Sequence, residues 1–158
     1  MHANTVQRQL PGVEACFPNE GSMVRELRAL LTNQTGPVCC SSVVSEFDYS
    51  SGRTDLIGLS SRAILHAFEA KLLKWREALE QARRNACFAH YTYVALPPRA
   101  AERALKAKDD FRRHGVGLLV LTGNEARLAI RPRKNVPLLP WLTKVALAHL
   151  SLDPTPPQ

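Results

Sequence analysis

The sequence lacks several patterns by which common enzyme classes are recognised. It has no G-x-x-x-x-G-K-[ST] phosphate-binding loop and no G-x-S-x-G turn, which disfavours an ATPase and a serine-type hydrolase. Its four cysteines, Cys16, Cys39, Cys40 and Cys87, include no C-x-x-C pair, and together with the dispersed histidines they lack the spacing of zinc ligands. We expect the cysteines to be reduced thiols of a cytoplasmic protein.

Long apolar runs are absent as well. No segment approaches the roughly 20 apolar residues that a membrane-spanning helix needs. The first residues also lack the charged start and apolar run of a signal peptide. We therefore expect a soluble protein with no membrane partner.

The composition is that of a single basic domain. A chain of 158 residues with 45% hydrophobic content can bury one core and is too short for two ordinary domains. We predict an N-terminal arm over 1–18, a domain over 19–150 and a disordered, proline-rich tail over 151–158. The net charge of +7 favours a polyanionic partner, of which nucleic acid is the first candidate.

Hydrophobic periodicity predicts alternating helices and strands. Asn19 is a suitable helix cap, and apolar residues then recur at helical spacing. We predict helices over 20–32, 74–86, 99–114 and 138–150, and strands over 41–49, 53–59, 63–72, 90–96, 116–121 and 126–131. This order implies an α/β fold with a mixed sheet flanked by helices.

The chemistry is concentrated in residues 52–81. Side chains on a strand alternate between its faces, so Glu69 and Lys71 share a face, and Asp55 can join them from the adjacent strand. Two close carboxylates repel each other unless a cation lies between them, and Mg²⁺ accepts a few oxygen ligands while keeping several waters. A neighbouring lysine can orient the attacking water and offset charge that develops on a phosphate.

The same residues carry a family resemblance. Gly52-Arg53-Thr54-Asp55, thirteen intervening residues and Glu69-Ala70-Lys71 resemble the PD-(D/E)xK signature of the restriction-endonuclease-like superfamily. The leading proline of that signature is Thr54 here. The resemblance implies a three-layer αβα core with a central mixed β-sheet flanked by helices. Its order of helix, three strands, helix and strand fits residues 20 to 96.

The resemblance also implies an activity. It implies a Mg²⁺-dependent endonuclease, with Mn²⁺ able to substitute, that hydrolyses phosphodiester bonds in DNA in preference to RNA. Asp55, Glu69 and the Ala70 carbonyl would hold the metal, and Lys71 would act on the water. Glu46, on the preceding strand, or Glu26, on the first helix, would add an acidic contact.

Further residues are assigned from the helix over 74–86. Gln81 matches a glutamine that positions water or nucleotide in related nucleases, whereas the tyrosine found four residues later in one subgroup is Asn85 here. Lys74 and Arg84 lie on a neighbouring face of this helix and, with Arg53, are candidates for binding nucleic acid. A later basic group could grip phosphates outside the cleft: Arg112, Arg113, Arg127, Arg131, Arg133 and Lys134.

Several alternatives stay open at this point. Asp55 could instead form a salt bridge with Arg53 or Arg62, and Gln81, Glu46 and Glu26 could be ordinary surface residues. The chain could be a catalytically inactive nuclease-fold module that binds nucleic acid or a partner protein, or an α/β protein whose motif arose by chance. Apolar residues of the helix over 138–150 allow a homodimer. We expect His66, which points away from Glu69, to be a packed core residue.

Overall fold

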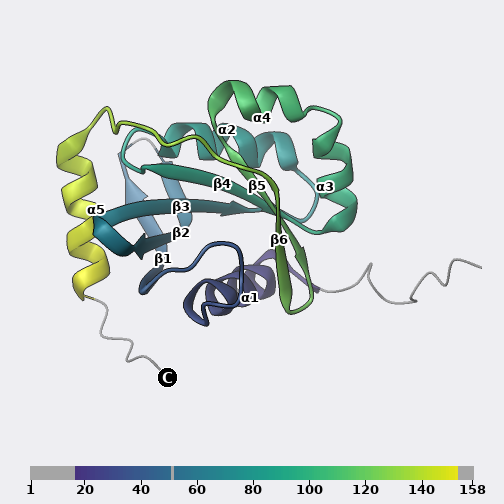
Figure 1. Cartoon of the computed structure of the whole chain (residues 1–158), viewed down its shortest axis with the longest axis horizontal. Coiled ribbons are helices and arrows are strands. Elements are labelled where there is room, and N and C mark those ends of the chain that lie inside the picture. The colour runs from purple at the N-terminus through teal and green to yellow at the C-terminus, as the bar shows by residue number, and fades with distance from the viewer. Residues whose placement is uncertain (1–16, 51, 153–158) are drawn as a thin grey trace, which may run out of the picture.

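The computed structural model describes residues 17–50 and 52–152 and has an α/β architecture. A six-stranded mixed sheet, with its strands in sequential order, is flanked by helices (Figure 1). The elements are α1 Glu20–Thr32, β1 Ser42–Tyr49, β2 Gly52–Ser60, β3 Ile64–Ala70, α2 Trp75–Asn85, β4 Tyr91–Leu96, α3 Pro98–Leu105, α4 Lys108–His114, β5 Gly117–Thr122, β6 Glu125–Ile130 and α5 Pro140–Leu152.

The sheet combines a meander with two crossover units. Strands β1, β2 and β3 are antiparallel neighbours. Strand β4 then pairs parallel with β3, and β5 pairs parallel with β4, so α2 and the α3–α4 pair form the crossovers. Strand β6 returns antiparallel beside β5. The carboxyl ends of β3 and β4 consequently lie at the same edge of the sheet.

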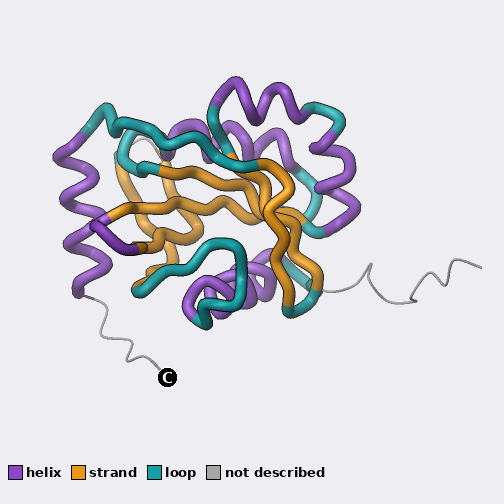
Figure 2. The backbone as a smooth tube through the Cα atoms, in the orientation of Figure 1, coloured by secondary structure: helices purple, strands orange, loops and turns teal. Residues whose placement is uncertain are grey.

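Helices cover both faces of this sheet (Figures 1 and 2). On one face, α1 packs through residues such as Met23 and Leu27 against Phe68 and other strand residues. On the other face, α2, α3 and α4 pack against β4 and β5, and α5 packs against β1, β2 and β3. Side-chain alternation along β3 therefore sends Phe68 toward α1 and Glu69 toward the opposite layer.

The first helix begins where its cap predicts. The Asn19 side chain accepts a hydrogen bond from the Ser22 amide at 2.8 Å, and the Ser22 side chain completes a capping box. Such a cap satisfies amide groups that the first turn leaves without partners. The predicted helix over 20–32 is confirmed, and the predicted strands and the other two single helices lie within two residues of those observed.

Two predicted boundaries are wrong. The single helix over 99–114 is divided into α3 and α4, because Ala107 has φ −113° and ψ 31°. The break lets the alanine face of α3 and the Phe111 ring of α4 each pack on the sheet. Helix α5 also continues through Ser151 and Leu152, which were assigned to the tail. The rest of that tail, 153–158, and residues 1–16 of the arm lie outside the described residues.

The expectation that His66 is a packed core residue is met. His66 is buried and bonded, with Nε2 2.9 Å from the Ser60 hydroxyl and Nδ1 3.1 Å from the Tyr93 hydroxyl. Cys39, Cys40 and Cys87 are free thiols, whereas Cys16 lies outside the described residues. Within the described part of the chain, no helix has the length and apolarity needed to cross a membrane.

Substitution of Gly58 tests how tightly the antiparallel strands β1, β2 and β3 pack beneath α1. A Cβ atom at this buried position would lie 2.6 Å from Cys40 Sγ and 3.3 Å from Cys40 Cβ. We expect Gly58→Ala to lower the free energy of unfolding by about 1–3 kcal/mol, because overpacking a dense core forces its neighbours to move. Urea denaturation measures the change. Gly36→Ala is the control, since its nearest new contact would be at 3.8 Å; equal stability of both variants would contradict the packing.

Candidate active site

Strands β2 and β3 separate where the predicted acidic residues lie. Their paired register runs from Ser60↔Ile64 to Leu56↔Phe68 and does not continue to Asp55 and Glu69. In place of a backbone ladder, the carboxylate of Asp55 accepts a hydrogen bond from the Ala70 amide at 2.9 Å. The two predicted metal-binding acids are thus brought together at the edge of this gap.

Glu69 has the most strongly shifted pKa among the predicted site residues. Its side chain is 1% exposed, and Oε1 accepts a hydrogen bond from Asn85 Nδ2 at 2.8 Å. The pKa of Glu69 is raised from 4.5 to about 8, chiefly by burial and then by the charge of Asp55, with a smaller contribution from a hydrogen bond with Asp55. The hydrogen bond from Asn85 and the charge of Lys71 lower the pKa. Glu69 therefore keeps its proton to a higher pH than an ordinary glutamate does.

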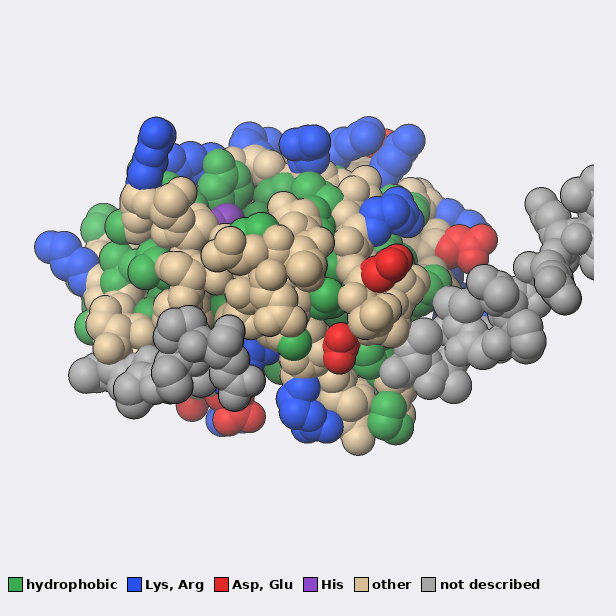
Figure 3. Space-filling model, turned by 60° about the horizontal axis from the view of Figure 1, so that its bottom comes forward, with side chains coloured by type: hydrophobic (Ala, Val, Ile, Leu, Met, Phe, Trp, Pro, Cys, Tyr) green, Lys and Arg blue, Asp and Glu red, His purple; other side chains and the backbone are tan. Residues whose placement is uncertain are grey.

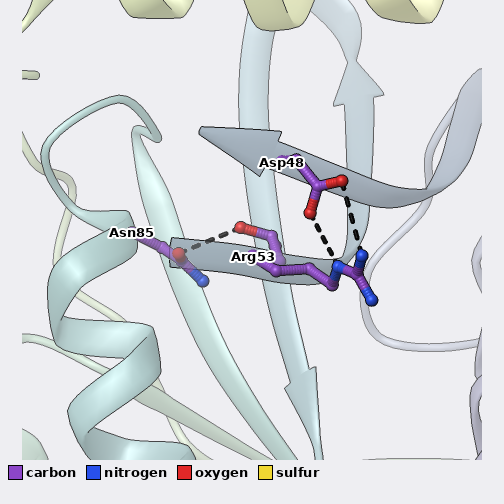
Figure 4. Close-up of polar contacts among 4 residues, drawn as sticks. Asp48, Arg53 and Asn85 are labelled. Carbon is purple, nitrogen blue, oxygen red and sulfur yellow. Dashed lines mark hydrogen bonds and ion pairs between the residues drawn. The ribbon is translucent and has the colours of Figure 1, made fainter. Parts of the chain in front are cut away.

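Asn85 lies at the centre of the polar contacts. It is fully buried, and its Oδ1 accepts hydrogen bonds from the Tyr49 hydroxyl at 2.6 Å and the Thr54 hydroxyl at 3.0 Å. Figure 4 shows Asn85 extending from α2 toward the strands. Our sequence analysis named Asn85 only as the residue that replaces a tyrosine of one nuclease subgroup and missed its buried position. The spacing of Ala78, Ala82 and Asn85 would have identified it, because it marks one buried stripe.

Lys71 follows β3 and is held by two other acids. Its Nζ lies 3.6 Å from Glu20 Oε2 and 3.7 Å from Glu77 Oε1, and its side chain is 19% exposed. Glu20 also accepts a hydrogen bond from the Leu72 amide at 3.4 Å. The acid of α1 that contacts Lys71 is therefore Glu20, which the sequence analysis missed. Glu26 lies six residues further along α1, about 9 Å along the helix axis.

Glu46 occupies an unusual position in β1. Its φ of 60° lies in the left-handed region, and the β1–β2 pairs Ser45↔Leu56 and Phe47↔Thr54 bracket it without including it. Its exposed side chain thus leaves the ladder at the level of Asp55. Glu46 and Asp55 are close enough that their charges help to raise the pKa of Arg53.

Arg53 pairs with Asp48 and not with Asp55. Its Nε lies 2.6 Å from Asp48 Oδ1, and Figure 4 shows the two side chains facing each other. A hydrogen bond from Arg53 is the main reason why the pKa of Asp48 is lowered. The salt bridge to Arg53 that the sequence allowed for Asp55 is therefore not formed, and the Asp55 carboxylate bonds to the backbone amide instead.

The remaining helix residues surround the site less closely. Gln81 on α2 is partly exposed, and its buried Oε1 has no hydrogen-bond partner among the described residues. Lys74, just before this helix, and Arg84 on it have exposed side chains, and Arg84 Nε donates to the Glu80 carbonyl at 3.5 Å. None of these three residues is seen to contact the acids in the part of the chain that the structure describes.

Most of the late basic group lies at the other edge of the sheet. Helix α4, with Arg112 and Arg113, ends just before β5 begins, and Arg131, Arg133 and Lys134 follow the end of β6. Since β3, β4 and β5 are parallel, this is the edge opposite to Glu69. Arg133 also donates to the Arg112 and Arg113 carbonyls, both at 3.4 Å. Figure 3 shows basic side chains along the upper border of the visible face.

Comparisons with known proteins inform the fold alone. No protein-family model matches the chain, and no curated protein matches it. A solved structure, the SPO1766 protein of unknown function from Silicibacter pomeroyi, is similar with a TM-score of 0.60 and 18% sequence identity. The similarity covers 81% of this chain and 81% of that chain. Both chains thus share the α/β architecture.

Glu69 makes the stability of the metal-free protein depend on pH. Because its pKa is about 8 in the folded chain and 4.5 ordinarily, the folded chain binds more protons between these values. The free energy of unfolding should then fall as pH rises, by up to about 1.4 kcal/mol per pH unit. Burial lowers the pKa of His66 from 6.5 to about 4, which opposes this trend below pH 6.5.

Comparison with Glu69→Gln isolates the contribution of Glu69 between pH 6.5 and 8, because His66 titrates alike in both proteins. We expect wild-type stability in urea to decline across this window relative to that of Glu69→Gln, because glutamine carries no titrating proton. Glu102→Gln, at an exposed position of α3, should decline as the wild type does. A parallel decline in Glu69→Gln would show that the carboxyl group of Glu69 titrates normally.

Proposed function

We propose that the chain is a metal-dependent nuclease of the PD-(D/E)xK type with a restriction-endonuclease-like core, and that it cleaves phosphodiester bonds within DNA. The observation that carries the proposal is the convergence of Asp55 and Glu69 at the point where β2 and β3 separate, with Lys71 following on β3. The order α1, β1, β2, β3, α2 and β4 supports it, because it matches the element order that the resemblance implies.

The donor set suits Mg²⁺. Mg²⁺ in phosphate-processing sites binds one or two carboxylates and completes its shell with waters and substrate oxygens. Asp55 and Glu69 supply two carboxylates, and the Ala70 carbonyl is the third proposed ligand. Among the described residues, no three His, Cys, Asp or Glu side chains are grouped to hold a metal, so protein side chains alone would leave positions for water and phosphate. When bound, the ion supplies Lewis acidity and a more acidic water.

The chain's own residues have separable tasks in this proposal. Asp55 and Glu69 would hold the cation, and the Lys71 ammonium would orient the attacking water and offset charge on the phosphate. Glu46, which lies opposite Asp55 between the pairs Ser45↔Leu56 and Phe47↔Thr54, is the candidate for a further acidic contact. The partly exposed Gln81 is the candidate for positioning the water or nucleotide, and Lys74, Arg84 and Arg53 are candidates for the DNA backbone.

Cleavage should require a divalent cation and both acids. We expect a panel of linear, supercoiled, branched and single-stranded DNA and of RNA to show cleavage of DNA with Mg²⁺ or Mn²⁺ and none with EDTA. Asp55→Asn should reduce the rate to background, because it removes a ligand charge without changing side-chain size. Intact substrates under every condition, with salt-sensitive binding, would instead identify a non-catalytic nucleic-acid-binding module.

Lys71 is expected to serve the reaction more than the fold. Lys71→Ala should slow cleavage by about 10²-fold or more, the range of a lost proton-transfer or water-positioning group. Its urea midpoint should change little, because the ion pairs with Glu20 and Glu77 span 3.6 and 3.7 Å and both acids are about half exposed. Lys106→Ala, an exposed lysine after α3, is the control. Cleavage by Lys71→Ala at the wild-type rate would remove the lysine from the mechanism.

A further inference from the structure

The contacts of Asn85 suggest a task beyond filling the core. Its side chain makes three hydrogen bonds: Nδ2 donates to Glu69, and Oδ1 accepts from the Tyr49 and Thr54 hydroxyls. The four residues come from α2, β3, β1 and β2, so one amide connects the helix to every strand of the meander. Asn85 and Thr54 are both 0% exposed, which keeps water from competing for these bonds.

The two hydroxyl groups determine which way the amide faces. With both of them donating to Oδ1, the NH₂ group of Asn85 is directed at Glu69. With Glu69 ionised, the state in which it would bind a cation, the reverse orientation would place the amide oxygen against a carboxylate oxygen, two acceptors in contact. Tyr49 and Thr54 therefore keep Asn85 a donor toward Glu69.

The Asn85 amide binds one oxygen of the Glu69 carboxyl group and leaves the second oxygen for a cation. Oε1 is bonded to Asn85 at 2.8 Å, and the carboxyl group also interacts with Asp55 across the gap between β2 and β3. A carboxylate fixed in this way needs little reorganisation when a cation binds to its second oxygen. Hydrogen-bond partners behind metal ligands commonly change metal affinity or activity by about 10- to 100-fold.

We propose that Asn85 is a positioning residue, which orients Glu69 for the metal and is itself oriented by Thr54 and Tyr49. This inference rests on the proposed function. Thr54 and Asn85 are also the two positions at which the chain departs from the resembled nuclease pattern, and they are hydrogen-bonded to each other at 3.0 Å. The hydroxyl group of Thr54, which a proline could not supply, is thus matched to the amide of Asn85.

The experiment measures the metal concentration that gives half-maximal cleavage. It compares single variants that remove either a hydroxyl group or the amide group. Asn85→Ala should raise this concentration by about 10- to 100-fold. Thr54→Val should raise it by a smaller factor, and Thr54→Ser, which restores the hydroxyl, should return it to the wild-type value. Thr92→Val is the matched control, because Thr92 is equally buried and its hydroxyl has no partner among the described residues.

The Thr54 pair separates positioning from general structural support. Val keeps the volume of Thr54 and removes the donor, whereas Ser keeps the donor and loses one methyl group, so a loss of packing cannot mimic the pattern. The two Thr54 variants also test the positioning role if Asn85→Ala does not fold. An unchanged metal dependence in Asn85→Ala, or in Thr54→Val if the former does not fold, would overturn the proposal.

A second measurement distinguishes failure of this inference from failure of the nuclease. If the wild type neither cleaves nor responds to metal, the proposed function falls, and urea unfolding of Asn85→Ala, Glu69→Leu and the double variant then tests the contact itself, because leucine has no acceptor for the Asn85 amide. Non-additive changes would show that Asn85 still orients the Glu69 carboxyl group, because contacting residues couple. Additive changes would overturn the inference as well.

Discussion

The burial of one carboxyl group, that of Glu69, is the constraint on which the other contacts of the candidate site depend. An ionised carboxylate in an apolar layer is strongly unfavourable unless a donor or a cation accompanies it. The chain supplies one donor, Asn85, and places a second acid, Asp55, nearby, so that the pair holds a proton where no cation is present. A structural core gains nothing from two adjacent acids, whereas a cation between them would satisfy both.

The fold produces this arrangement through the end of a β-ladder. Strands β2 and β3 pair up to Leu56 and Phe68, and past that point Asp55 bonds to the Ala70 amide through its side chain. The parallel partner β4 keeps β3 in the sheet, which allows β2 to diverge without loss of support. Helix α1 reaches the same edge through Glu20, and α2 through Glu77 and Asn85, so residues distant in sequence surround one strand end.

Much of the fold followed from local sequence, and the contacts around the site did not. Helix α1 was predictable because Asn19 caps it and its apolar residues recur every three or four positions. The division between α3 and α4 was not, since helical periodicity runs across Ala107 and only packing on the sheet selects the break. Asp55, Glu69 and Lys71 were found from strand alternation. The Glu20–Lys71 contact was missed because it joins residues whose proximity depends on how α1 docks.

The central claim is that Asp55 and Glu69 together bind one divalent cation, and Mn²⁺ binding watched by water proton relaxation tests it without any nucleic acid. The account predicts one saturable site in the wild type, which is lost in Asp55→Asn and in Glu69→Gln and retained in Glu102→Gln. Absence of a saturable site in the wild type, or a site that survives both substitutions, would contradict it.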